Sequence, residues 1–153
     1  MVFFKILFVI SWICFFLFAN KNKFHIFIST CYFGMILGFV TDFIIDIYPL
    51  WEYPVPTKKE RFWTKILDEF GIYLVVIYFY LQYFPKTKSF GNKMYYIFKW
   101  TIFTILLEWV ALKTGYMKHG LWWSLGFSYI SDWILFWCFY HHNKWIERYK
   151  REE

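Results

Sequence analysis

Hydrophobic and polar positions divide this chain into five apolar runs separated by short polar gaps. The runs extend over about residues 2–19, 24–48, 66–84, 95–112 and 121–140. Each is close to the ~20 residues that a helix needs to cross the hydrocarbon of a bilayer. Backbone groups in lipid have no water to bond, so runs of this kind form helices there. The pattern predicts an all-α polytopic membrane protein, an up-and-down bundle of five transmembrane helices.

The polar gaps fit this organisation. Pro49 and Pro85 directly follow the second and third runs, where proline breaks no interior helical hydrogen bond. The longest gap, residues 49–65, carries aromatic residues that indicate a segment lying at the membrane interface: Trp51, Tyr53, Phe62 and Trp63. The expected organisation is a five-helix transmembrane domain over residues 1–142, followed by a short charged cytoplasmic tail over residues 143–153.

Composition strengthens the membrane assignment. Hydrophobic residues make up 59% of the chain and aromatic residues 29%. A soluble domain of 153 residues would expose large apolar patches if it carried 21 Phe, 13 Tyr and 10 Trp. The net charge of +6 is explained by basic loops beside anionic lipid, and no segment resembles a nucleic-acid-binding module. The expected partner is the lipid bilayer, with a membrane-protein partner or a second copy of the chain as alternatives.

Basic residues favour one orientation in the membrane. With five spans, the side that holds the N-terminus carries seven basic residues: Lys5, Lys58, Lys59, Arg61, Lys65, Lys113 and Lys118. The opposite side carries ten: Lys21, Lys23, Lys86, Lys88, Lys93, Lys99, Lys144, Arg148, Lys150 and Arg151. Cytoplasmic loops hold the excess of Lys and Arg, so the sequence predicts a multi-pass protein of the cell membrane with a cytoplasmic C-terminus.

Common catalytic and metal-binding motifs are absent from the sequence. Cys14, Cys31 and Cys138 lie far apart in apolar runs, a spacing that indicates neither a zinc site nor a disulfide framework. There is no P-loop, GxSxG, HExxH or dinucleotide-binding fingerprint. The sequence therefore identifies no catalytic residue and no cofactor, and it leaves open whether the protein is an enzyme.

Acidic residues supply the strongest functional candidates. Five of them lie toward ends of apolar runs that meet on the N-terminal side of the membrane: Asp42, Asp46, Asp68, Glu69 and Glu108. Carboxylates at membrane depth are costly and are commonly functional. Asp42 and Asp46 are four residues apart, so they share one helix face. His119 comes from a loop on the same side. These six residues form the candidate polar pocket.

Two interpretations of this pocket stay open. As a functional site it could bind a divalent cation through oxygen ligands, relay protons or form a general acid/base pair. As a structural feature it would consist of ion pairs, such as Glu108 with Lys113 or Lys118, that fix how helices dock. Asp132 lies near the middle of the fifth run and is expected to face the bundle, neutral or hydrogen-bonded. Gly34 and Gly38 have the spacing that allows close helix approach.

Several of the same residues carry a resemblance to a family. The motifs are Gly38-Phe39-Val40-Thr41-Asp42, Asp68-Glu69-Phe70-Gly71-Ile72-Tyr73, Glu108-Trp109, Gly115, and Trp122-Trp123-Ser124 through Ser128-Tyr129. Over roughly residues 30–135 the chain resembles an uncharacterised family of small multi-pass membrane proteins of spore-forming Firmicutes. The resemblance implies a helical plasma-membrane protein and no particular chemistry.

Two classes of function follow from these observations. The first is a structural or accessory membrane protein that works with a partner. The second is an enzyme or an ion- or proton-handling protein that uses the acidic pocket at the extracytoplasmic face. A carboxylate cluster around a cavity favours the second class, and carboxylates each paired with a lysine favour the first.

Overall fold

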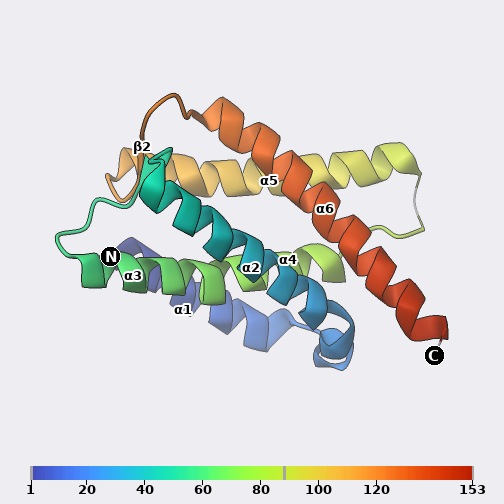
Figure 1. Ribbon diagram of the computed structural model, residues 1–153. Helices are drawn as coiled ribbons and strands as arrows, with labels where there is room; N and C mark the ends of the chain where they lie inside the picture. The colour runs from blue at the N-terminus through green and yellow to red at the C-terminus, as the bar shows by residue number, and fades with distance from the viewer. Residues whose placement is uncertain (1, 88, 153) are drawn as a thin grey trace.

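The computed structural model describes residues 2–87 and 89–152, and over these residues the protein is an all-helical bundle of five rods (Figure 1). Consecutive rods run back and forth along the molecule. They comprise α1 (Val2–Phe18), α2 (Phe24–Ile47), the continuous rod of α3 (Lys58–Leu67), η2 (Asp68–Tyr73) and α4 (Leu74–Gln82), then α5 (Phe90–Lys113) and α6 (Leu125–Glu152). A short 3₁₀ turn, η1 (Lys21–Lys23), joins α1 to α2.

Each predicted apolar run forms a helix, with changes at the boundaries. The third rod begins at Lys58, inside the segment expected to be an interfacial loop, because Thr57 caps it by accepting from the Glu60 N–H. The last helix begins at Leu125 rather than near residue 121 and continues without a break through Asn143. The expected charged tail is therefore helical as far as Glu152, whereas its last residue, Glu153, lies outside the described residues, as do Met1 and Lys88.

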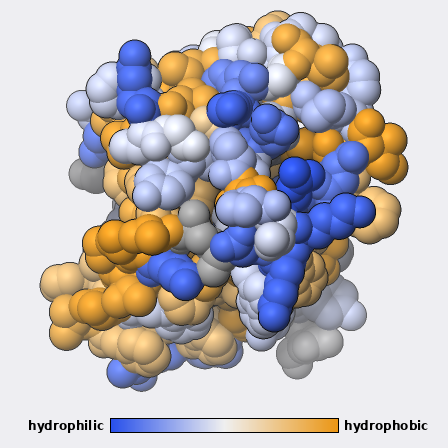
Figure 2. Space-filling view, turned by 90° about the vertical axis from the view of Figure 1, so that its left-hand side faces the viewer, coloured by the Kyte–Doolittle hydropathy of each residue, from blue (hydrophilic) through white to orange (hydrophobic). Residues whose placement is uncertain are grey.

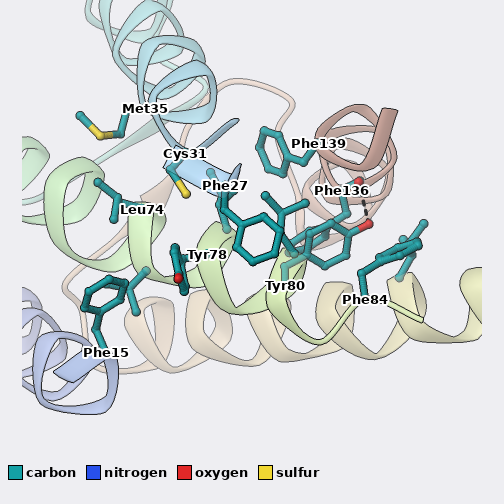
Figure 3. Packing of buried hydrophobic residues seen from close by; sticks show 14 residues of the cluster. Phe15, Phe27, Cys31, Met35, Leu74, Tyr78, Tyr80, Phe84, Phe136 and Phe139 are labelled. Carbon is teal, nitrogen blue, oxygen red and sulfur yellow. Dashed lines mark hydrogen bonds between the residues drawn. The ribbon is translucent and has the colours of Figure 1, made fainter. Parts of the chain in front are cut away.

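α4 lies at the centre of the bundle. Its Ile77, Tyr78 and Tyr80 are fully buried, and Figure 3 shows the two tyrosines packed among aromatic rings from other helices. Each buried phenol finds a backbone acceptor, because an unpaired hydroxyl would be costly there. Tyr80 donates to the Phe136 carbonyl at 2.9 Å and Tyr78 to the Asn20 carbonyl at 2.7 Å. These bonds tie the central helix to α6 and to the turn after α1.

The two spaced glycines of α2 serve packing inside the bundle. A Cβ at Gly34 would collide with the Cδ1 atom of Ile77 and lie 3.3 Å from the Phe139 ring. A Cβ at Gly38 would collide with the carboxylate of Glu69. Small residues at both positions therefore let α2 approach the third rod closely.

Two loops pair at the end of the molecule that holds the N-terminus. β1 (Trp51–Glu52) and β2 (Lys118–His119) form a short antiparallel ladder with Trp51 opposite His119. The Gly120 N–H donates to the Leu50 carbonyl at 2.7 Å, and a Cβ at Gly120 would collide with the Pro49 carbonyl. The loop after α2 and the loop after α5 are therefore held together. Figure 2 looks onto this end, where hydrophilic side chains gather in the middle of the face with hydrophobic ones around them.

Much of the outward surface of the rods is apolar. Exposed hydrophobic side chains include Ile6, Val9 and Ile13 on α1, Ile36, Val40 and Phe43 on α2, Phe103 and Leu106 on α5, and Ile130 and Ile134 on α6. Among the described residues, two helical stretches are long and apolar enough to cross a membrane, Lys21–Ile47 and Phe90–Lys113. α1 is also apolar but has only 17 residues.

The contact between Gly34 and Ile77 generates the first prediction. Gly34→Ala should destabilise the protein by about 1–3 kcal/mol, the usual effect of overpacking a core. Ile77→Val removes the colliding Cδ1 atom and alone should cost about 0.5–1.5 kcal/mol. The double variant should lose less unfolding free energy than the two single variants lose together, because the two residues share one contact. Thermal unfolding of the full chain in detergent measures this, with Gly91→Ala, which has open space around it, as control. Strict additivity would contradict the close approach.

Candidate functional site

A π-helical turn sets the positions of Asp68 and Glu69. In η2 the Leu74 N–H donates to the Glu69 carbonyl, five residues earlier, instead of four as in an α-helix. Such turns insert an extra residue into a helix and occur frequently at functional sites. A Cβ at Gly71, within the same turn, would collide with the Phe8 ring, so α1 also approaches closely here. The turn directs both carboxylates toward the interior of the bundle.

The interior at this end contains a cavity of about 430 Å³. Five carboxylates from four rods line it: Asp42 of α2, Asp68 and Glu69 of η2, Glu108 of α5 and Asp132 of α6. Aromatic and apolar side chains complete the wall, among them Trp51, Tyr53, Tyr73, Trp123, Leu37, Leu50, Met117 and Leu135. An adjoining cavity of about 210 Å³ shares Asp68, Glu108 and Asp132 and extends toward α1.

Glu108 is the most fully bonded of the five. Its Oε1 atom lies 2.6 Å from His119 Nε2 and accepts from Ser128 Oγ at 2.7 Å. The indole of Trp123 donates to the same Ser128 oxygen at 2.8 Å. The β1–β2 ladder thus brings His119 to the end of α5. These contacts fix Glu108 between two loops and the first turns of α6.

Asp68 is held by a tyrosine from the long loop. Tyr53 is 8% exposed, and its hydroxyl donates to Asp68 Oδ2 at 2.9 Å. Burial, reinforced by the neighbouring Asp68, raises the pKa of the Tyr53 phenol well above its ordinary value. Tyr53 therefore stays protonated and acts as a fixed donor to the carboxylate.

Lys65 supplies the positive charge at the cavity rim. Its Nζ atom lies 2.9 Å from Asp46 Oδ1 and 3.9 Å from Asp42 Oδ1, and it donates to the Asp42 carbonyl at 2.9 Å. The Asp46 side chain is 50% exposed, and Asp46 lines a separate hollow of about 60 Å³ rather than the large cavity. Within the described residues, Lys65 pairs with Asp46 and Asp42, Glu108 contacts His119 in place of the expected Lys113 or Lys118, and no ion pair involves either of these two lysines.

Glu69 differs from the other four. It is 8% exposed, and its Oε2 atom is buried without a hydrogen-bond partner. The carboxylate lies against the backbone of Gly38, in the space that a larger residue would fill. A buried carboxylate oxygen without a donor carries a large desolvation penalty. The site therefore offers an unused acceptor in its interior.

Asp132 lies on the bundle side of α6. Its Oδ2 atom accepts a hydrogen bond from Thr104 Oγ1 of α5 at 2.5 Å, and Asp132 lines both cavities. Ser128 and Ser131 of the same helix also line the large cavity. The polar groups of α6 are thus directed toward α5 and the cavity.

The sequence-predicted site residues are partly brought together. Asp42, Asp68, Glu69 and Glu108 share the large cavity, Asp132 joins them, His119 binds Glu108 from its loop, and Asp46 lies outside. In the part of the chain that the structure describes, no three His, Cys, Asp or Glu side chains form a group that could hold a metal ion. The carboxylates are therefore distributed around the cavity wall.

Sequence reasoning missed Tyr53, Lys65 and Ser128 as partners of the carboxylates. Tyr53 and Lys65 belong to the segment expected to lie flat at the interface, and Ser128 is one of several serines near the start of α6. Only the pairing of the two loops brings Tyr53 and His119 to the site, and a two-residue ladder leaves no periodic signal in the sequence.

Comparisons with protein-family models, with curated proteins and with solved structures give no match for this chain. The resemblance to a family of small multi-pass membrane proteins stays a prediction.

The bond from Tyr53 to Asp68 generates the second prediction. Tyr53→Phe should destabilise the protein by about 1–3 kcal/mol, because it leaves a buried carboxylate oxygen without its donor. Thermal unfolding of the full chain in detergent is the measurement. Tyr32→Phe is the matched control, since Tyr32 is 53% exposed on α2. Equal unfolding midpoints for Tyr53→Phe and the unmodified protein would contradict the assigned role.

Proposed function

We propose that this chain is a small multi-span protein of the cell membrane whose acidic cavity, at the extracytoplasmic end of the bundle, takes up a proton or a cation. The observation that carries the proposal is the buried Glu69 carboxylate, which has an unpartnered oxygen and lies among four further carboxylates around one cavity. Carboxylates in such a setting stay ionised together only if positive charge compensates them.

We further propose that all five rods cross the membrane, in addition to the two candidate spans in α2 and α5. Besides α2 and α5, the outer faces of α1 and α6 present Ile6, Val9 and Ile134 to the surroundings. α4 packs in the middle of the bundle, and with η2 and α3 it forms one rod of 25 residues from Lys58 to Gln82, about 37 Å at 1.5 Å per residue. A bundle with the apolar α4 at its centre and apolar outer faces suits lipid better than water.

The orientation follows from the basic residues. Ten of them lie on the C-terminal side and seven on the N-terminal side, which favours a cytoplasmic C-terminus. The cavity lies at the end with the N-terminus, next to the paired loops, and would therefore face the extracytoplasmic side.

A structural or accessory role with a partner is the second candidate, and two ion pairs favour it. Lys65 binds Asp46 and lies 3.9 Å from Asp42, and Glu108 is hydrogen-bonded to His119, so part of the acidic cluster already has partners inside the chain. Under this alternative, Glu108→Gln would lower accumulation of the protein in the membrane, because it weakens the link between α5, α6 and the loops. Under the cavity proposal, Glu108→Gln accumulates normally and loses the response to cations.

The third prediction concerns topology. Reporter fusions after Glu153 should give a cytoplasmic signal, and reporters inserted near Thr57 should give an extracytoplasmic one, as the excess of basic residues on the C-terminal side favours. A cytoplasmic signal near Thr57 together with an external C-terminus would reverse the orientation. Signals that place both positions on the same side would contradict five spans.

The fourth prediction tests cation uptake. A ligand that binds the folded state at one hundred times its dissociation constant stabilises it by about 2.7 kcal/mol. The unfolding midpoint of the full chain in detergent should therefore respond to protons or to one cation from a panel of Na⁺, K⁺, Mg²⁺, Ca²⁺ and organic ammonium ions. Glu69→Gln should remove that response while it preserves the shape of the side chain.

Glu60→Gln is the matched control, since Glu60 lies at the start of α3 in the Thr57 cap and Gln preserves this type of cap. The proposal is wrong if the unfolding midpoint shifts neither with any of the cations nor with pH. It is also wrong if Glu69→Gln shows the same shift as the unmodified protein.

A further inference from the structure

We infer that the cation accepted by this cavity is a protonated primary or secondary amine with an apolar body. This inference rests on the proposed function and names its ligand class. Three features of the cavity carry it: its volume, the distribution of its charges and the chemistry of its walls.

The volume favours an organic molecule. Pockets for small molecules occupy about 300–1,000 Å³, and the cavity of about 430 Å³ lies within this range. A single water or inorganic ion needs much less space. The cavity therefore has room for a charged group together with a ring or a short aliphatic chain.

The charges favour an ammonium group. Among the described residues that line the cavity there is no Lys, Arg or His, and five of these residues carry carboxyl groups. A divalent metal ion requires several oxygen ligands that converge on one point, and no three acidic or metal-binding side chains of the described residues form such a group. An ammonium ion instead pairs with one carboxylate through directed N–H bonds.

Glu69 is the anchor for this ammonium group. Asp68 accepts from Tyr53, Asp132 from Thr104, and Glu108 from Ser128. The Oε2 atom of Glu69 is buried and has no donor. Glu69 lines the cavity, so an N–H donor carried by the ligand would bond its carboxylate from the cavity side, which favours a protonated amine over a quaternary ammonium ion, because the latter has no N–H.

The walls fit the apolar part of such an amine. Trp51 and Trp123 lie with ring centroids 5.1 Å apart, and both line the cavity beside Tyr53 and Tyr73. The faces of aromatic rings attract cations, and Trp does so most strongly. Leu37 and Leu135 give the cavity an apolar surface as well. A purely inorganic cation would leave these surfaces unused.

The experiment measures binding of benzylammonium to the full chain in lipid nanodiscs by isothermal titration calorimetry, with empty nanodiscs subtracted. We expect saturable binding of benzylammonium and no saturable binding of benzyl alcohol or benzoate, which have a similar ring but no positive charge. Benzyltrimethylammonium should bind at least tenfold more weakly than benzylammonium, because it cannot donate to Glu69.

Two variants make the test specific. Glu69→Gln should weaken benzylammonium binding at least tenfold, whereas Glu60→Gln should change it less than twofold. If Glu69→Gln fails to fold, Trp51→Leu replaces it, and this variant should weaken benzylammonium binding by removing an aromatic face. If the tested variant, Glu69→Gln or its replacement Trp51→Leu, folds and binds benzylammonium as tightly as the unmodified protein, the inference is wrong.

The outcomes separate this inference from the proposed function. If protons or inorganic cations act through Glu69 but benzylammonium does not bind, the amine inference fails and the proposed function stands. If benzyl alcohol binds as tightly as benzylammonium, the cavity is merely apolar and the amine inference fails as well. If no cation or proton acts at all, both fail together.

Discussion

The close approach of α2 to the rod of α3, η2 and α4 determines both the packing of the core and the position of the Glu69 carboxylate. Because Gly34 has no side chain, Ile77 can pack against it. One turn further on, Gly38 leaves room for the carboxylate of Glu69 in the same way. The same helix surface thus makes an apolar contact in the core and a polar contact at the cavity. Because both contacts lie on one face of α2, a larger residue at either glycine would separate α2 from the rod and widen the cavity.

The helices could be predicted from the sequence, because each apolar run carries its own signal. The runs end at prolines or polar gaps, and the boundaries at Ile47 and Gln82 lie within two residues of the predicted ends. The contribution of Gly34 and Gly38 to packing inside the bundle also follows from their spacing. In contrast, the start of the third rod at Lys58 depends on the Thr57 cap inside a segment rich in proline and charge, where the apolar pattern gives no indication of a helix.

The candidate site could be predicted only in part, for a physical reason. The helix ends that meet at one side follow from up-and-down topology, so Asp42, Asp68 and Glu108 were expected to lie near one another. Which partner each carboxylate finds depends on loop geometry and on the π-helical turn, and neither has a periodic pattern. Lys65 rather than Lys113 or Lys118 reaches Asp46, because Lys65 lies one turn before η2 on the rod that packs against α2.

Buried polar groups in the bundle differ in whether they have hydrogen-bond partners. In the core, Tyr78 and Tyr80 donate to backbone acceptors, whereas the Trp12 and Trp133 indole nitrogens and the Thr101 hydroxyl are buried without a hydrogen-bond partner. At the cavity end, Glu69 is buried with one oxygen unpaired, and four further carboxyl groups line the same cavity. Replacing Glu69 by an apolar residue would remove that desolvation penalty. Glu69 is one of several buried polar groups without a hydrogen-bond partner among the described residues, and of these groups it alone lines the large cavity.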